Sequence, residues 1–166
     1  MNIFLIGFMG SGKSTTGKKL ARRLGYAFLD TDSEIVNRFG MSVNEIFDRF
    51  GEGKFRDAEV RLLNELIRRN NIVVSTGGGL PCHGENMELI NRNGISVYLR
   101  ASPAELFRRL STRKHKRPLI RDLDDRELMQ FIESKLAERE PFYTMASHTV
   151  RGLHAGPEEL IRLLRG

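Results

Sequence analysis

The sequence predicts an α/β fold in which helices flank a parallel β-sheet. Short apolar runs alternate with longer amphipathic segments along the chain, and this alternation is typical of parallel strands joined by crossover helices. The first run, residues 2–7, is almost entirely apolar, as expected for a strand buried on both faces. The 166 residues correspond to a single domain, residues 1–166, which is long enough to bury a hydrophobic core.

Five segments are predicted to be strands because they are short apolar runs bounded by glycine or polar residues. These segments are residues 2–7, 26–29, 72–75, 95–99 and 148–150. Asp30-Thr31-Asp32 closes the second strand, and three glycines follow the third. Chemically distinctive turns are therefore expected after both strands.

The segments between these strands are predicted to be helices. Gly25 is expected to be the C-cap of the first helix. Ser42 with Glu45 fits a capping box, and Pro103 stands at the first turn of its helix, where proline is tolerated. The predicted helices cover residues 13–24, 33–70 with breaks near Gly40 and Gly51, 85–93, 103–110, 125–140 and 157–164.

Residues 111–125 lack the apolar periodicity of the rest of the chain and are dense in arginine and lysine. A polar excursion of about 15 residues inside a compact domain is usually a functional loop or a lid. We therefore expect a lid at about residues 111–125.

The composition is that of an ordinary globular protein. Lys and Arg number 27 against 21 Asp and Glu, a net charge of +6, which favours anionic partners without identifying them. The single cysteine, Cys82, excludes an internal disulfide framework and fits a reducing compartment. No apolar run approaches the roughly 20 residues needed to span a bilayer, and no basic segment precedes the first run as in a signal peptide. The prediction is a cytoplasmic protein without membrane contact.

Residues 7–14, Gly-Phe-Met-Gly-Ser-Gly-Lys-Ser, fit the P-loop pattern Gly-x4-Gly-Lys-Ser/Thr. Glycines let backbone N–H groups turn toward phosphate oxygens, and the following helix adds its positive N-terminus. Lys13 is expected to reach the β- and γ-phosphates, and the Ser14 hydroxyl to bind Mg²⁺. The alternative is a turn that only joins a strand to a helix, but both flanking elements of a P-loop are predicted here. We therefore expect this segment to bind a nucleoside triphosphate.

Two aspartates follow the second strand, where residues of an open parallel sheet line the ligand crevice. One carboxylate is expected to face the metal and the other an acceptor hydroxyl. The alternative is helix capping, because Asp32 precedes a helix predicted to start at Ser33 and aspartate is a good N-cap. The third strand ends in Ser75 and Thr76, without the metal-binding Asp of many P-loop proteins. Asp30 is therefore the nearest acidic candidate for Mg²⁺.

The glycines at 77–79 let a ligand approach the backbone closely, because they carry no Cβ; the alternative is a flexible turn. Three arginines are candidates for binding an anionic acceptor, since a guanidinium group pairs bidentately with carboxylate and phosphate. These are Arg56, Arg117 and Arg139. The remaining basic residues of the lid, Arg113, Lys114, Lys116 and Arg121, are expected to be mostly solvated.

Over nearly its whole length the chain resembles the shikimate kinase family. The P-loop alone is shared by many proteins, whereas the ordered set of further signatures is more specific. These are Phe28-Leu-Asp30-Thr-Asp32, Gly51-Glu-x-x-Phe-Arg56-x-x-Glu59, Gly77-Gly78-Gly79, Arg117-Pro118-Leu119 and Arg139-x-Pro141-x-Tyr143. The resemblance implies a P-loop kinase fold with five parallel strands in the order 2-3-1-4-5, an acceptor-binding helical region at about residues 32–61, and a monomer.

The activity that this resemblance implies is transfer of the γ-phosphoryl group of ATP to the 3-hydroxyl of shikimate, a step toward chorismate and the aromatic amino acids. Asp32 then contacts the acceptor hydroxyl as base or orienting group. Arg139 and Arg56, which Glu59 orients, bind the shikimate carboxylate. The implied shikimate-binding residues are Asp32, Arg56, Gly77, Gly78, Gly79 and Arg139.

On the nucleotide side, the resemblance implies that Lys13 and Arg117 act in catalysis with Asp32. Mg²⁺ is held by Ser14, with Asp30 acting through water. The implied ATP-binding residues are Gly10, Ser11, Gly12, Lys13, Ser14, Thr15, Arg113 and Arg117.

Two positions depart from the family pattern on the adenine side. Leu110 and Ala155 stand where some members carry arginines near the base. Arg109 and Arg113 are the alternatives for the first of these roles, so the adenine contacts stay open.

Two rival functions remain to be weighed. Gluconate kinases share the P-loop and a carboxylate acceptor, but the triple glycine and the segments around Arg56 and Arg139 separate this chain from them. A nucleic-acid-binding module is suggested by the basic run at 108–121, yet that run lacks interleaved aromatic residues. We therefore expect ATP and shikimate, and no nucleic acid, as partners.

Overall fold

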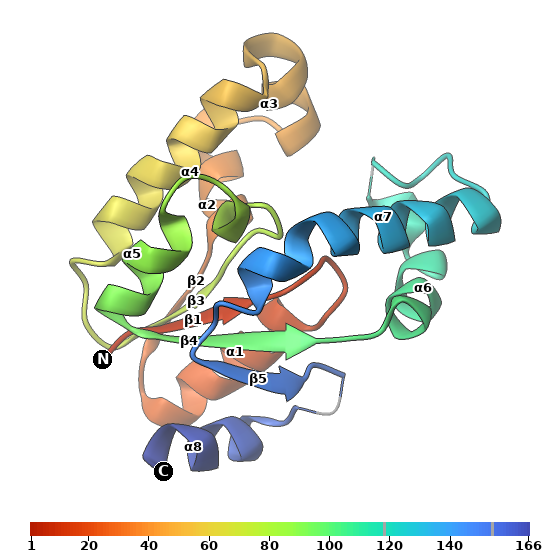
Figure 1. The fold of residues 1–166 in the computed structure, drawn as a ribbon. Coiled ribbons are helices and arrows are strands. Elements are labelled where there is room, and N and C mark those ends of the chain that lie inside the picture. The colour runs from red at the N-terminus through yellow and green to blue at the C-terminus, as the bar shows by residue number, and fades with distance from the viewer. Residues whose placement is uncertain (118, 154) are drawn as a thin grey trace.

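The computed structural model describes residues 1–117, 119–153 and 155–166. Its centre is a five-stranded sheet in the order β2-β3-β1-β4-β5, and every neighbouring pair is parallel (Figure 1). The predicted fold class and strand order are therefore confirmed. The strands are β1 (Ile3–Ile6), β2 (Ala27–Asp30), β3 (Ile72–Ser75), β4 (Ile95–Arg100) and β5 (His148–Arg151).

Helices cover both faces of the sheet. The first and last helices lie on one face, and the remaining long helices lie on the other or beyond its carboxyl edge (Figure 1). The α-helices are α1 (Lys13–Leu24), α2 (Thr31–Phe39), α3 (Val43–Phe50), α4 (Glu52–Leu66), α5 (Asn86–Asn93), α6 (Pro103–Ser111), α7 (Asp125–Tyr143) and α8 (Pro157–Arg165). Two short 3₁₀ helices, Leu80–Cys82 and Lys114–Lys116, are also present.

Strand β1 shows why the first apolar run has no polar position. Ile3 and Leu5 pack into the cluster under α1 and α8, whereas Phe4 and Ile6 pack into the larger cluster under α4 to α7. All four side chains are fully buried. The central strand is thus enclosed on both sides, as its composition predicts.

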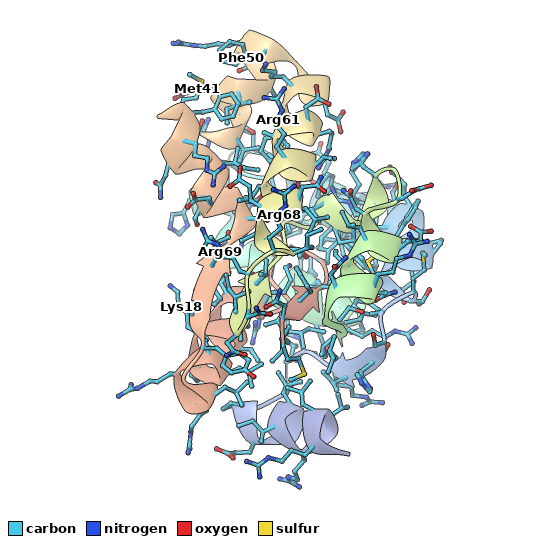
Figure 2. The ribbon with its side chains drawn as sticks, turned by 90° about the vertical axis from the view of Figure 1, so that its left-hand side faces the viewer. Lys18, Met41, Phe50, Arg61, Arg68 and Arg69 are labelled. Atoms are coloured by element: carbon cyan, nitrogen blue, oxygen red, sulfur yellow. The ribbon has the colours of Figure 1, made fainter. Side chains whose placement is uncertain are left out.

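Residues 31–66 fold into three consecutive helices that break at Gly40 and Gly51, as predicted. Met41 and Phe50 lie at the tip of this region, far from the C-terminal helix (Figure 2). The expected capping box at Ser42 is half formed, because Ser42 Oγ accepts from the Glu45 N–H at 3.2 Å while no return bond to Ser42 occurs in the described residues.

Several element ends differ from the prediction by a few residues, and two of these differences bear on the site. Helix α2 begins at Thr31, and its N-cap is Asp30, whose Oδ1 accepts from the Ser33 N–H at 3.1 Å. Asp32 is therefore not the cap, and its carboxylate is left available in the first turn. Helix α7 does not end at residue 140 but continues through Pro141 to Tyr143. The buried ring of Tyr143 anchors this last turn, which outweighs the backbone hydrogen bond that proline removes.

None of the helices in the described residues is long and apolar enough to cross a membrane.

Candidate active site

The P-loop joins β1 to α1 and forms a cradle at the carboxyl edge of the sheet. Gly10 and Gly12 adopt φ angles of 80° and 92°, in the left-handed region that favours glycine. Lys13 Nζ donates to the carbonyls of Gly7 at 2.7 Å and Phe8 at 2.9 Å. Burial lowers the pKa of Lys13 to about 8, although the nearby carboxylates oppose this shift. The loop therefore holds the ammonium group of Lys13 close to the backbone, where it can bind an anion.

Oxygen atoms from three elements meet beside this cradle. Ser14 Oγ, on α1, donates to Asp30 Oδ2 at 2.5 Å and lies 3.1 Å from Ser75 Oγ at the end of β3. Mg²⁺ prefers such hard oxygen ligands, and in nucleotide sites it takes one or two from the protein with the rest from water and phosphate. The residues present therefore fit a Mg²⁺ site. Ser75 belongs to this group of oxygen ligands, whereas the sequence analysis noted it only as the position that lacks the usual aspartate.

Each glycine of the triplet lies directly under one charged side chain. A Cβ on Gly77 would collide with the Asp32 carboxylate. On Gly78 it would come within 2.9 Å of Arg139 Nη1, and on Gly79 within 2.6 Å of Arg56 Nη1. A Cβ at any of these positions would displace the charged end of the side chain above it, so the three glycines let these groups lie directly on the loop backbone. The Gly77 N–H also donates to Thr31 Oγ1 at 2.8 Å, which ties the loop to α2.

Arg56 is held by carboxylates on its own helix. Its Nη1 donates to Glu59 Oε1 at 2.5 Å, and its Nη2 donates to Glu52 Oε1 at 3.2 Å. Glu59 is only 1% exposed, whereas Arg56 remains partly accessible. Arg139 approaches from α7 and lies over the Phe8 ring, with Cζ 5.7 Å from the centroid. Two guanidinium groups from different helices thus face the same glycine-rich loop.

Two cavities meet between these groups. One, of about 310 Å³, is lined by the P-loop, by Asp30 and Ser75, and by Arg113 and Arg117. The other, of about 270 Å³, lies between α3, α4, α7 and the glycine triplet. Both cavities are lined by Met9, Asp32, Gly78 and Arg117. Burial, with the neighbouring charge of Asp30, raises the pKa of Asp32, and this carboxyl group borders both cavities.

Most of the predicted site residues fall on one of the two cavities. Ser11 does not; it is buried, and its N–H donates to the Phe8 carbonyl at 3.2 Å. Pro118 of the lid signature lies outside the described residues. The first cavity has Gly10, Gly12, Lys13, Ser14, Thr15, Asp30, Gly77, Arg113 among its lining residues. The second has Arg56, Gly79, Arg139.

The second cavity also has an apolar wall that sequence reasoning missed. Val43, Phe47 and Phe55 supply it from α3 and α4, with Leu119 opposite. The regular apolar spacing of the helices could have flagged the first three, but periodicity reads such residues as core. Their rings and methyl groups suit the carbon skeleton of an acceptor whose polar groups face the arginines.

On the adenine side, the two departures have packing roles. A Cβ on Gly10 would lie 3.1 Å from Leu110 Cδ2, so Leu110 packs directly on the P-loop. Arg109 Nη1 donates to the Gly10 carbonyl at 3.1 Å, and Arg113 lines the same cavity. Ala155 is buried in the cluster beneath α1 and α8. Arg109 is therefore occupied with the P-loop, which leaves Arg113 as the freer candidate for the base.

Glu59 gives a prediction about pH. Burial raises the pKa of Glu59 from 4.5 to about 7, although the Arg56 charge opposes the shift. The folded state then binds more protons than the unfolded chain between these values, so this group's contribution to stability is lost as pH rises from 4.5 through 7. We expect Glu59→Gln to be more stable than the parent at pH 8, by on the order of 3 kcal/mol, in denaturant unfolding.

The same Glu59→Gln change removes the charge that holds Arg56, so the KM for an anionic acceptor should rise about tenfold. Glu65→Gln is a matched control on the same helix, because Glu65 pairs with Arg38 at 2.7 Å on the exposed surface and such pairs contribute little. A Glu59→Gln protein less stable than the parent at pH 8 would contradict the assignment.

Comparison with known proteins agrees with this geometry. The family model described as shikimate kinase matches residues 9–164. Shikimate kinase of Bacteroides thetaiotaomicron is 47% identical over 148 residues, covering 89% of this chain and 85% of the relative. Its counterpart from Pelotomaculum thermopropionicum is 39% identical over 168 residues, covering 99% and 95%.

Solved structures give the same result. A crystal structure of shikimate kinase from Bacteroides thetaiotaomicron superposes with a TM-score of 0.95 at 42% identity, covering 100% of this chain and 99% of the other. Shikimate kinase from Acinetobacter baumannii in complex with shikimate has a TM-score of 0.86 at 35% identity, covering 99% and 90%. A gluconokinase from Sinorhizobium meliloti reaches 0.56 at 20% identity, covering 97% and 87%, and shares the fold alone. The chain belongs to the shikimate kinase family.

Proposed function

We propose that this protein transfers the γ-phosphoryl group of ATP to the 3-hydroxyl of shikimate. The observation that carries the proposal is the junction of the two cavities, because Asp32 and Arg117 line both of them. A nucleotide in the P-loop cavity would direct its terminal phosphate toward this junction. An acceptor in the second cavity would present a hydroxyl group there.

In this reaction the protein would act mainly by positioning and by neutralising charge. Arg56 and Arg139 hold the acceptor carboxylate beside the glycine triplet, and Asp32 orients the attacking hydroxyl and accepts its proton. Lys13 and Arg117 stabilise the negative charge on the transferring group. Ser14, with Asp30 nearby, would hold Mg²⁺, which would supply further neutralisation of the phosphates. The helical region 32–61 would bind the acceptor and the segment 111–125 would act as a lid.

A coupled assay of ATP consumption tests the proposal. The acceptors compared are shikimate, gluconate and several nucleoside monophosphates, each with Mg²⁺ and with EDTA as control. Among these acceptors we expect only shikimate to be phosphorylated, and we expect the reaction to require Mg²⁺. Turnover with gluconate and none with shikimate would favour the alternative kinase and overturn the proposal.

The lid arginine gives a second prediction. Arg117 is proposed to contact the transferring phosphate through its planar guanidinium fork, which lysine cannot reproduce. We expect Arg117→Ala to lower kcat about 10³-fold. Arg117→Lys should recover only about a tenth of the parent kcat, since it restores charge without the fork. Equal activity of the lysine variant and the parent would show that charge alone is needed.

We further propose that the protein is a monomer and acts in the cytoplasm on freely diffusing substrates. Both cavities are lined by residues of this one chain, so the site needs no second copy to be complete. A single species of about 19 kDa in light scattering would agree with the monomer.

A further inference from the structure

Tyr143 belongs to a sequence signature to which the proposed mechanism gives no role. It is fully buried and does not line either of the two cavities. It stands four residues after Arg139 on α7, so the two side chains lie on the same face of the helix, one turn apart. Any effect of Tyr143 on the reaction must therefore pass through a neighbour.

Arg139 is one such neighbour, and Gly78 is the one whose backbone the hydroxyl group contacts. The Tyr143 hydroxyl donates to the Gly78 carbonyl at 2.6 Å. A Cβ on Gly78 would lie 2.9 Å from Arg139 Nη1 and 3.5 Å from Tyr143 Oη. One face of α7 thus brings both residues to Gly78, where the guanidinium group lies close to the α-carbon and the hydroxyl group donates to the carbonyl. The only other donor near this carbonyl among the described residues is the Cys82 thiol at 3.9 Å, which is a weak one.

The hydroxyl also fixes the group that follows. The peptide between Gly78 and Gly79 is trans, as are all peptides in the described residues, so the Gly79 N–H points away from the Gly78 carbonyl. With the carbonyl directed to Tyr143, this N–H is directed to the other side of the loop. Gly78 and Gly79 line the acceptor cavity, and no described atom accepts from the Gly79 N–H. A backbone donor is thereby held ready for an acceptor oxygen.

The ring of Tyr143 is itself held in place from the sheet. It packs on the ring of Tyr98 on β4, with centroids 5.2 Å apart. The Tyr98 hydroxyl donates to Glu140 Oε2 at 2.5 Å, which links the strand to the same turn of α7. The position of the Tyr143 hydroxyl is therefore set by the sheet, and the loop glycine has no Cβ or side chain of its own to do this.

We propose that Tyr143 is a positioning residue for the acceptor, which orients the peptide between Gly78 and Gly79 and thereby aims its N–H into the acceptor cavity. This inference rests on the proposed function for the identity of the acceptor. Loss of the hydroxyl leaves the Gly78 carbonyl without its strong donor and frees the peptide to rotate. Binding of shikimate would weaken, while the phosphate cradle would be untouched.

The test compares Tyr143→Phe with Tyr98→Phe. Both changes remove one hydroxyl group from the same pair of buried, contacting rings, but only the first hydroxyl contacts the glycine loop. Steady-state kinetics and calorimetric titration with shikimate are measured for both variants. For Tyr143→Phe we expect the KM and Kd for shikimate to rise about tenfold, with kcat and the KM for ATP within about twofold of the parent. Tyr98→Phe keeps the ring that packs on Tyr143 and loses only the bond to Glu140, so we expect lower thermal stability with both KM values unchanged.

Equal shikimate affinity in Tyr143→Phe and the parent would overturn the inference. An equal loss of shikimate affinity in Tyr143→Phe and Tyr98→Phe would also overturn it, because that result would indicate an effect of packing alone. The parent protein is assayed first. Its failure to phosphorylate shikimate would overturn the proposed function, and this outcome is distinct from an active parent whose Tyr143→Phe variant binds shikimate normally. If Tyr143→Phe fails to fold, Tyr143→His and Tyr143→Leu are compared instead, because only histidine keeps a ring with a hydrogen-bond donor. We expect Tyr143→His to be soluble and to have a lower KM for shikimate than Tyr143→Leu. A KM for shikimate that is not lower in Tyr143→His would overturn the inference.

Discussion

Replacement of Lys13 by methionine is expected to lower kcat/KM by at least about 10³-fold while leaving the fold intact. The P-loop holds this ammonium group, with two backbone carbonyls as its partners, beside the place proposed for the terminal phosphate. Methionine fills a similar volume but offers neither charge nor a donor. Activity should therefore be lost because charge on the transferring group is no longer stabilised.

The stability of the same variant gives an independent check. The pKa of Lys13 is lowered from 10.5 to about 8 by burial. The unfolded chain therefore binds more protons than the folded one between these values, so the contribution of this lysine makes stability rise with pH across that window. Lys13→Met should lack this rise and should melt no lower than the parent at pH 7.

Lys18→Met is the matched control for Lys13→Met. Lys18 lies on the same helix, α1, but its side chain is on the outside of the molecule (Figure 2). We expect parent-like kinetics from this variant. Parent-like turnover in Lys13→Met itself would contradict the assignment of the phosphate cradle.

The fold could be predicted from sequence because the central strands of the sheet are buried on both faces. Strands such as β1 then have no polar position, and the P-loop glycines mark the first strand end without ambiguity. The order of the strands in the sheet could not be predicted in this way, because apolar runs show where strands lie in the chain but not which strands are neighbours. That order came from the family resemblance, and the parallel pairings confirm it.

Local exceptions arose where tertiary contacts overrode a local rule. Proline at 141 predicts a helix end, but the buried Tyr143 keeps the last turn of α7 in place. Asp30 and Asp32 are equally good caps by residue type. Only the structure shows that Asp30 takes the cap, together with a hydrogen bond from Ser14.

The candidate site was predictable where chemistry demands a residue type, as for the P-loop and the arginines. It was not predictable where shape decides. Phe47 and Phe55 look like any core residues in the sequence, yet they line the second cavity, where the acceptor is proposed to bind. The reason for the glycine triplet was likewise hidden, because the side chains that cover it come from α2, α4 and α7.

Asp32→Asn is the second change with a large expected effect. Asp32 lines both cavities, and burial raises its pKa. The amide keeps the shape and a hydrogen bond but cannot accept a proton. We expect kcat to fall about 10²- to 10⁴-fold, within the range for loss of a general base, with the KM for ATP nearly unchanged. Since a buried carboxylate is removed, the variant should melt no lower than the parent at pH 7.

Asp30→Asn is the matched comparison for Asp32→Asn, because it tests whether the two carboxylates have different roles. Asparagine caps helices as well as aspartate does, so α2 should keep its start, while the oxygen beside Ser14 loses its charge. This variant should need about tenfold more Mg²⁺ for half-maximal rate and recover much of its kcat at saturating metal. Asp32→Asn should gain nothing from added Mg²⁺. If both variants instead responded alike to Mg²⁺, the two carboxylates would share one role. The assignment of Asp30 to the metal and of Asp32 to the acceptor would then be wrong.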